Sequence, residues 1–531
     1  MTTTDAVPGT ADAVASGAVS VASGAVSDAS GAVSETLADL VAAEDVLLFV
    51  NAAITATGQR EFHSGAYQQQ LSLDFLHEYV RVNYRRVYAS SLALDINDHN
   101  AALIVRSLLE TAADASAEER RTEGRLIAAR LAVLPPQRVY RLFGALRRAK
   151  VNNRRTRAIM RDWLAARPDL AHDAVKYRGG LKTAARHVHL RCPEGDGPLG
   201  EVGAFLFRSG KQPRYRHGLL DAWRRAHYEQ GAVHELPFTV AEGFAARHGM
   251  KREVFLERAA PGMTRLERLR TLGQRSTGAE PRRPSDIDLT VMPLTRLALY
   301  VLSLGFDVRA ADRAELTGAL RAAARRAAGP YAGSWGRVAA VLDDSYSSSG
   351  SGQKRRRPLA VALACHFLLE ALAAPGAYRP LWTSGSTDPL LVRPWGPTPL
   401  GIRVLDALEP GSGGAPDRLI IVSDGWDNAP PGLAGEVLRV WRTRLDPGRR
   451  TAAVHLNPVY DADGFDVRRL APSVPTAGVR DAEDLPSLVE IAQFAEGRTG
   501  LGELYAYLDR QVARFLDGGA GDEVRMEGTA R

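Results

Sequence analysis

The sequence predicts a multidomain protein in which an α-helical repeat part is followed by a doubly wound α/β domain. Three observations support this. The chain has 531 residues, several times the ~150 residues of an average domain. Apolar residues recur at helical spacing over residues 35–330, with almost no strand-like alternation. From residue 337 onward, short runs rich in Val, Ile and Leu alternate with helical segments, the pattern of a mainly parallel sheet.

The two ends of the chain are expected to be tails. The hexapeptide ASGAVS occurs three times at a period of seven, over 15–20, 22–27 and 29–34. Each copy carries Gly and Ser and no large apolar residue. Such a segment cannot bury enough surface to offset the entropy of ordering it. We therefore predict that residues 1–34 form a disordered low-complexity tail, and that 519–531 form a short polar one.

The segment 35–330 is predicted to be a series of amphipathic helices. Many helices in series without a strand are typical of an α-solenoid. No clean sequence repeat is visible, so this prediction depends on helix density alone. Residues 266–288 are expected to form a mobile loop. Three stripes at i, i+3, i+4, i+7 or similar spacing carry the helix prediction: Val139, Leu142, Phe143 and Leu146; Ile159, Met160, Trp163 and Leu164; and Leu294, Leu297, Val301 and Leu304.

The segment 331–518 is predicted to be the α/β domain. Its first strand covers 337–343, and a helix opened by Pro358 follows. The run LIIVS at 419–423 is typical of a strand covered on both faces. Helices are expected at 398–408, 432–445 and 486–495, and a last helix at 501–516 is expected to close this domain. The further strand candidates are Tyr378–Thr383, Leu390–Trp395, Arg418–Ser423 and Thr451–Asn457.

Composition excludes several classes of protein. The two cysteines, Cys192 and Cys365, exclude a disulfide framework and a Cys-based zinc module. No window reaches the ~18 apolar residues that a membrane-spanning helix needs. The N-terminus has no basic region followed by an apolar one, so no secretory signal is visible. We therefore expect a cytoplasmic protein without a membrane partner.

The charge of the chain is concentrated in its middle. The whole chain is +7, whereas residues 101–330 carry 42 Lys and Arg against 24 Asp and Glu, a net +18. A basic segment in an otherwise near-neutral protein indicates a polyanionic partner. The alternative is that the arginines merely solvate helix surfaces. For one basic patch, a solvated helix surface and a polyanion-binding surface have equal support. This patch consists of Arg147, Arg148, Lys150, Arg154, Arg155 and Arg157.

Three polar clusters follow predicted strands or open a helix in the second domain. The first, Asp343 to Ser347, has the form D-x-S-x-S; the second contains Thr398; the third is Ser423-Asp424-Gly425. Ligands of open α/β sheets bind at the carboxyl ends of the strands. Carboxylate and hydroxyl oxygens suit Mg²⁺, Mn²⁺ or Ca²⁺ and not zinc. The sequence thus predicts a divalent cation site.

In this order and spacing, the three clusters resemble the metal-ion-dependent adhesion site of the von Willebrand factor A domain, over about 331–518. The resemblance implies that Ser345, Ser347 and Thr398 are direct ligands of Mg²⁺ or Mn²⁺, and that Asp343 and Asp424 act mainly through water. One coordination position would stay open for an acidic group of a partner. The extra acid Asp344 and the basic run 354–357 depart from the motif, and we expect them to alter metal occupancy or to recruit an anionic ligand.

A helical part followed by such a domain resembles the Ro family, whose helical part is the TROVE module. The patches that carry the resemblance lie at 172–190, 260–274 and 289–305, although Leu181 stands where the family has a His. The resemblance implies a ring of HEAT-like repeats, closed by the A domain. It also implies that single-stranded 3′ ends of defective non-coding RNA enter the ring and that structured Y-type RNA binds its outer surface. The residues predicted to contact RNA are Lys176, Arg178, Lys182, Arg186 and His189, whereas His187 is expected to be a packing residue.

The leading hypothesis is therefore an RNA-binding protein that acts in RNA quality control, or as an adaptor that reaches an RNA-processing protein through the A domain. The alternative is a metal-dependent protein-interaction scaffold. Enzymatic activity is not expected, because the chain lacks G-x-x-x-x-G-K-[ST], G-x-S-x-G and H-E-x-x-H motifs and an evident positioned base.

Overall fold

The computed structural model describes residues 44–63, 65–190, 198–208, 214–264, 288–409, 414–485 and 501–518, together with 267, 268 and 271. The predicted tails 1–34 and 519–531, the helix predicted at 486–495 and nearly all of the loop predicted at 266–288 lie outside these residues. Among the described helices, none is long and apolar enough to cross a membrane.

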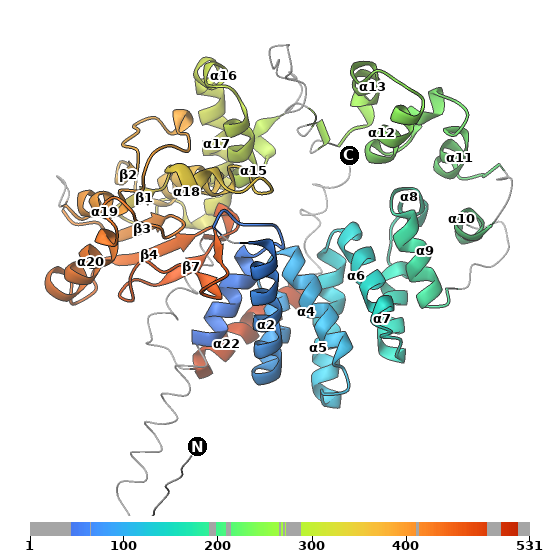
Figure 1. Cartoon of the computed structure of the whole chain (residues 1–531), viewed down its shortest axis with the longest axis horizontal. Helices are drawn as coiled ribbons and strands as arrows, with labels where there is room; N and C mark the ends of the chain where they lie inside the picture. The colour runs from blue at the N-terminus through green and yellow to red at the C-terminus, as the bar shows by residue number, and fades with distance from the viewer. Residues whose placement is uncertain are drawn as a thin grey trace, which may run out of the picture.

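The described residues before 330 are helical, as predicted, and contain no strand. A helix at residues 44–55 comes first. Figure 1 shows that α2 to α13 follow one another in a curved row. The helices are α2 (Ala66–Asn83), α3 (Arg85–Ser90), α4 (Asp98–Glu110), α5 (Ala117–Val133), α6 (Pro136–Arg148), α7 (Arg154–Ala165), α8 (Leu170–Lys176), α9 (Arg178–His187), α10 (Pro198–Phe207), α11 (Gly218–Arg225), α12 (Phe238–Arg247), α13 (Arg252–Ala259), α15 (Leu294–Ser303), α16 (Phe306–Ala311) and α17 (Arg313–Ala328).

Local sequence signals fix the ends of several of these helices. Ser116 and Glu119 form a reciprocal capping box at the start of α5. The Asn153 side chain accepts a hydrogen bond from the Thr156 amide at the start of α7. Helix α6 has Pro136 at its first position, where the missing N–H has no partner to lose. Its predicted apolar stripe is buried, which confirms the helical periodicity.

The second part contains a parallel sheet of five strands in the order β2-β1-β3-β4-β7. Four strands match predicted segments: β1 (Val338–Leu342), β2 (Tyr378–Trp382), β3 (Arg418–Val422) and β4 (Ala452–Asn457). The fifth, β7 (Thr476–Gly478), was not predicted. The predicted strand Leu390–Trp395 is wrong: a 3₁₀ turn, η7 (Pro389–Leu391), and a loop occupy this region. Pro389 and Pro394 lack the N–H groups that a sheet ladder requires.

Helices cover both faces of this sheet, as the sequence predicted. Ala340 and Leu342 of β1 belong to the core on the side of α18 (Arg357–Leu372). Ala339 and Val341 point to the opposite core, shared with α19 (Leu400–Leu408) and α20 (Leu433–Val440). Alternate residues of a strand point to opposite faces, so an all-apolar strand such as β1 needs a helix on each side. The coarse α/β prediction is confirmed.

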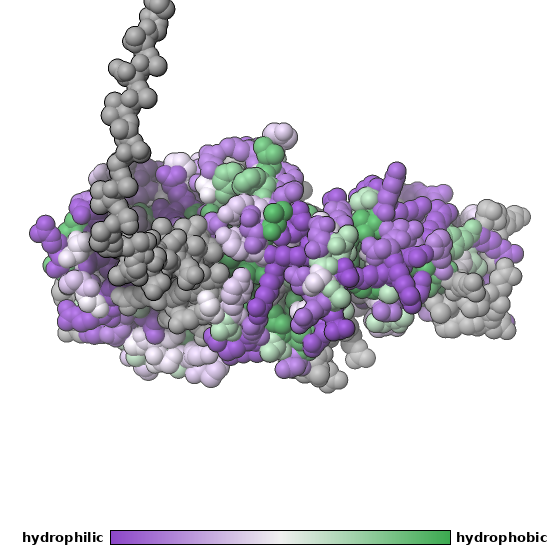
Figure 2. All heavy atoms as spheres, turned by 90° about the horizontal axis from the view of Figure 1, so that it is seen from below, coloured by the Kyte–Doolittle hydropathy of each residue, from purple (hydrophilic) through white to green (hydrophobic). Residues whose placement is uncertain are grey.

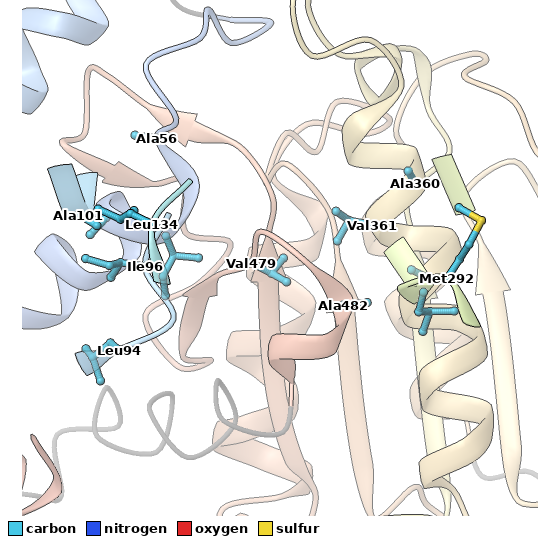
Figure 3. Close-up of a cluster of buried hydrophobic side chains, with 14 of the residues drawn as sticks. Ala56, Leu94, Ile96, Ala101, Leu134, Met292, Ala360, Val361, Val479 and Ala482 are labelled. Carbon is cyan, nitrogen blue, oxygen red and sulfur yellow. The ribbon is translucent and has the colours of Figure 1, made fainter. Parts of the chain in front are cut away.

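Both ends of the helical part contact the sheet part. Helices α15 and α17 pack on α18. At the other end, the Asn51 side chain accepts a hydrogen bond from the Gly478 amide of β7 (2.9 Å). A Cβ at Gly478 would lie 2.9 Å from the Asn51 carbonyl oxygen, so this close approach requires glycine. Figure 3 shows buried side chains running across the junction, from Leu94 and Ile96 through Val479 to Val361 of α18.

The C-terminal helix α22 (Leu501–Gly518) does not close the α/β domain as predicted. It packs on α3, α5 and the 3₁₀ turn η1 (Ser91–Ala93) of the helical part. Arg86 of α3 pairs with Asp509 (2.8 Å) and lies over the Tyr505 ring. Amphipathic periodicity predicts that a helix has a buried face but not which surface it covers.

Candidate cation site and basic surface

The predicted cation ligands lie at the carboxyl ends of neighbouring strands. Asp343 follows β1 and Asp424 follows β3, and these two strands pair in parallel. Both carboxylates are buried, as are Ser345 and Thr398. Thr398 lies two residues before α19, whose start is set by Pro399. The fold therefore brings the three motif loops to one edge of the sheet.

Hydrogen bonds fix the geometry of the first motif. The Ser345 amide donates to Asp343 Oδ1 (2.9 Å), and the Ser423 hydroxyl donates to Asp343 Oδ2 (3.0 Å). The Ser345 and Ser347 hydroxyls are 3.4 Å apart. This arrangement collects two hydroxyl oxygens beside a carboxylate on one short loop.

The other two loops are tied to the first. The Tyr346 amide donates to the Gly396 carbonyl (3.0 Å), just before Thr398. The Thr398 amide donates to the Asn428 side chain (2.7 Å), which follows the third motif. The Gly425 backbone has φ +80°, and a Cβ there would lie 2.8 Å from the Arg468 carbonyl oxygen, so the third motif requires glycine at this turn.

The electrostatics of this cluster favour a bound cation. Burial and, to a lesser extent, the nearby charge of Asp424 raise the pKa of Asp343 to about 7, against hydrogen bonds from Ser345 and Ser423. A buried pair of carboxylates is stabilised when a cation neutralises it. Among the described residues, no three His, Cys, Asp or Glu side chains form a cluster that could hold a metal. A cation here would therefore depend on hydroxyl oxygens as well, and hard-oxygen sites of this kind suit Mg²⁺ or Mn²⁺.

The two departures from the motif have structural roles. Asp344 accepts hydrogen bonds from Thr383 Oγ1 (2.8 Å) and the Ser384 amide (2.8 Å), so it braces the end of β2. In the basic run, Lys354 pairs with Glu61 and Arg357 pairs with Asp481 (2.6 Å). The charges of these two residues are therefore paired inside the protein, whereas Arg355 is exposed, and recruitment of an anionic ligand by the run stays a prediction.

Sequence reasoning missed His63, which lies at the cation site. His63 Nε2 is 3.3 Å from Asp424 Oδ2, across 361 residues of chain. The imidazole stacks on Trp426, with ring centroids 4.7 Å apart and an interplanar angle of 30°. No local pattern marks this residue, because it lies in the connection between two helices of the other part.

The predicted RNA residues lie on or beside the pair formed by α6 and α9. Gly180 allows the two helices to approach, since a Cβ there would lie 2.7 Å from Tyr140 Cβ. Next to this contact is a hollow of about 720 Å³. Two of the residues predicted to contact RNA, Lys176 and Arg178, line it. The other residues that line it are Gln137, Tyr140, Arg141, Gly144, Arg148, Val175, Tyr177, Gly179, Gly180 and Thr183.

A second, smaller hollow of about 380 Å³ lies at the other end of the same helix pair. Arg186 and His189 line it together with Arg147, Lys150, Asn152 and His187. His189 is exposed and takes φ +51° just beyond α9. His187 is a packing residue, as expected: its Nε2 lies 3.0 Å from the Val151 carbonyl, and burial lowers its pKa.

The predicted RNA residues differ in how free their side chains are. Arg178 donates to the Phe205 carbonyl (2.9 Å) and lies over the Phe205 and Trp223 rings, so its guanidinium is largely used in packing. Lys182 and Arg186 both lie over Phe207; Arg186 also lines the smaller hollow, whereas Lys182 lines neither hollow.

The cations of the basic patch between Arg147 and Arg157 likewise differ in how free their side chains are. Arg155 is partly buried and pairs with Glu123 (3.3 Å), while Arg147 and Lys150 line the smaller hollow.

Comparison of the sequence with protein-family models and with curated proteins finds no match.

Proposed function

We propose that this chain is an RNA-binding protein of the Ro type. The observation that carries the proposal is the pair of basic hollows on α6 and α9. Residues 136–190, which include both helices, contain 14 Lys and Arg against 3 Asp and Glu. Figure 2 views the molecule from below and shows a strongly hydrophilic surface over this stretch of the row of helices. Concentrated positive charge is the electrostatic footprint of a nucleic-acid surface.

The two hollows offer the chemistry that single-stranded RNA needs. Lys176, Arg141 and Arg148 in the larger hollow would contact phosphates, and Tyr177 there offers a ring on which a base can stack. His189 would stack or bond to phosphate in the smaller one. Stacking on an aromatic ring contributes about 1–3 kcal/mol per base, with little sequence preference. This chemistry fits the unpaired ends of defective RNA, and structured Y-type RNA would bind the outer basic surface.

Fluorescence anisotropy with one unpaired RNA tests the proposal. With roughly five phosphate contacts, affinity should fall about a hundredfold from 50 to 200 mM salt, since each contact adds about 0.7 to the log–log slope. Lys176→Ala combined with Arg186→Ala should weaken binding and flatten that slope. Arg444→Ala combined with Arg450→Ala, two exposed cations of the sheet part, is the control of equal charge. Binding that is unchanged in the first double variant would contradict the assignment.

The proposal also covers the architecture of the helical part and of the sheet part. The helical part would be a TROVE-like ring of HEAT-like repeats, and the sheet part a von Willebrand factor A domain with a cation at Asp343, Ser345, Ser347, Thr398 and Asp424. Support comes from the contacts of both ends of the helical part with the sheet part. Calorimetry with Mg²⁺ and Mn²⁺ on the full chain tests the site. Identical heats for wild type and Asp343→Ala would contradict it.

A second candidate function is a metal-dependent protein-interaction scaffold. One observation favours it: each of the three motif loops carries an exposed aromatic residue, namely Tyr346, Trp395 and Trp426. Aromatic residues are enriched at protein interfaces. Scaffold function predicts a partner that chelator releases and nuclease does not, whereas the RNA proposal predicts the reverse.

A further inference from the structure

The loop at residues 56–63, which connects the helix 44–55 to α2, is fastened to the loop after the first motif. The Arg60 amide donates to Gln353 Oε1 (2.8 Å). Lys354 Nζ donates to the Thr55 carbonyl (3.1 Å) and pairs with Glu61. These contacts hold the loop of the helical part against residues 351–354, a few positions beyond Ser347.

The same loop carries His63 to the cation site in a fixed orientation. Phe62 packs edge-to-face on the ring of Tyr346, with centroids 6.1 Å apart. The His63 ring stacks on Trp426 and meets the Phe62 ring edge-to-face, with an interplanar angle of 77°. Its side chain is 27% exposed, whereas that of Asp424 is 3% exposed. The imidazole thus closes over a buried carboxylate, with Nε2 directed at Oδ2.

The spacing of these atoms fits two ligands of one cation. Ligands in adjacent positions of an octahedral ion, each about 2.1 Å from it, lie about 3 Å apart. His63 Nε2 and Asp424 Oδ2 are 3.3 Å apart, and the Ser345 and Ser347 hydroxyls are 3.4 Å apart. Each of the two pairs therefore has the spacing of adjacent ligands, and both pairs lie at the same edge of the sheet.

We propose that His63 Nε2 is a ligand of the cation bound at this site, supplied by the helical part of the same chain. This inference rests on the cation site proposed above. His63 would take the position that the adhesion-site resemblance leaves to a partner's acidic group. Imidazole nitrogen is a better ligand for first-row transition cations than for Mg²⁺. The site accordingly prefers Mn²⁺ to Mg²⁺, and a partner's carboxylate must displace His63 to reach the bound cation.

Pulsed electron paramagnetic resonance of Mn²⁺ bound to the full chain tests the proposal. Wild type should show coupling to a nitrogen nucleus, and labelling the histidines with ¹⁵N should shift that signal. His63→Ala should lose the signal and bind Mn²⁺ about tenfold more weakly, with a much smaller change for Mg²⁺. His172→Ala, which removes a partly exposed histidine of the helical part (39% exposed) that has no proposed role, should behave as wild type.

The possible failures are distinguishable. If Mn²⁺ binds to wild type and is lost in Asp424→Ala, yet wild type shows no nitrogen coupling, His63 is not a ligand and the proposal is overturned while the cation site stands. If wild type binds no Mn²⁺ at all, the cation site itself fails and the role of His63 fails with it. The wild-type spectrum decides the first point without any variant, so a folding defect in His63→Ala would not obscure the result.

Discussion

Replacing Lys354 by methionine should destabilise the protein strongly, although methionine has a similar length and is apolar. The Lys354 and Glu61 side chains are 8% and 3% exposed, so neither charge is solvated. Burial raises the pKa of Glu61 and lowers that of Lys354, in each case against the opposing charge of the partner. For each of the two side chains, the free-energy cost of burying its charge therefore exceeds the gain from pairing with the other charge.

The magnitude follows from this imbalance. Lys354→Met leaves the Glu61 carboxylate buried without its cation, and removal of one partner of a buried ion pair costs about 3–5 kcal/mol. Lys354→Met combined with Glu61→Leu removes both charges and should be close to wild type, because apolar replacements of whole buried ion pairs are often neutral or stabilising. The double variant should thus be more stable than Lys354→Met by about 2 kcal/mol or more.

Urea unfolding at pH 7, followed by circular dichroism, measures these differences. Arg439→Met is the control, because Arg439 forms an ion pair with Glu436 in which both side chains are about 60% exposed. Exposed pairs contribute about 0–1 kcal/mol, so this variant should change stability little. The reasoning is refuted if Lys354→Met is as stable as Arg439→Met, or if the double variant is less stable than Lys354→Met.

Three further predictions concern other positions. Burial lowers the pKa of His77 to about 4. Below pH 6.5 the unfolded chain therefore binds a proton at this histidine, whereas the folded chain does not until the pH approaches 4. Between pH 7 and 5, the unfolding free energy of wild type should fall by about 2 kcal/mol more than that of His77→Gln. Burial and a nearby carboxylate raise the pKa of Asp343 to about 7. In the presence of a chelator at pH 8, Asp343→Asn should therefore melt at a higher temperature than wild type, although it should bind no cation. Equal melting temperatures would contradict this. Gly180→Ala should lower the unfolding free energy by about 1–3 kcal/mol through its clash with Tyr140, whereas Gly179→Ala, with open space around it, should not.

The sequence predicts the sheet well where one strand is covered on both faces, because a short apolar run rich in Ile and Val, such as Leu419–Val422, is typical of a strand buried on both sides. It fails where pairing depends on tertiary contacts. Strand β7 has three residues and ends in Gly478, where the helix 44–55 packs. Nothing in so short a run separates a strand from a loop. The contacts of α22 were likewise unpredictable, since amphipathicity leaves the partner surface undefined.

The cation ligands were predictable for a specific reason. In parallel sheets the carboxyl ends of neighbouring strands meet at one edge, so Asp343 and Asp424 are brought together by β1 and β3 even though 80 residues separate them in the chain. His63 follows no such rule. It approaches from a connection between helices, and its position depends on the contacts of the loop around it.

The proposed role of His63 has one further consequence, which concerns the junction of the two parts. A cation that binds only while the loop 56–63 lies against the sheet part stabilises that arrangement by about 2.7 kcal/mol when its concentration is one hundred times its Kd. If the cation binds His63, Mn²⁺ should therefore slow hydrogen exchange of the Arg60 and Glu61 amides, which donate to Gln353 and Gln69. The slowing should approach a hundredfold where these amides exchange through opening of the loop. Mn²⁺ should leave these amides unchanged in His63→Ala. Equal slowing in the variant would show that the cation acts on the sheet part alone and that the two parts are joined independently of it.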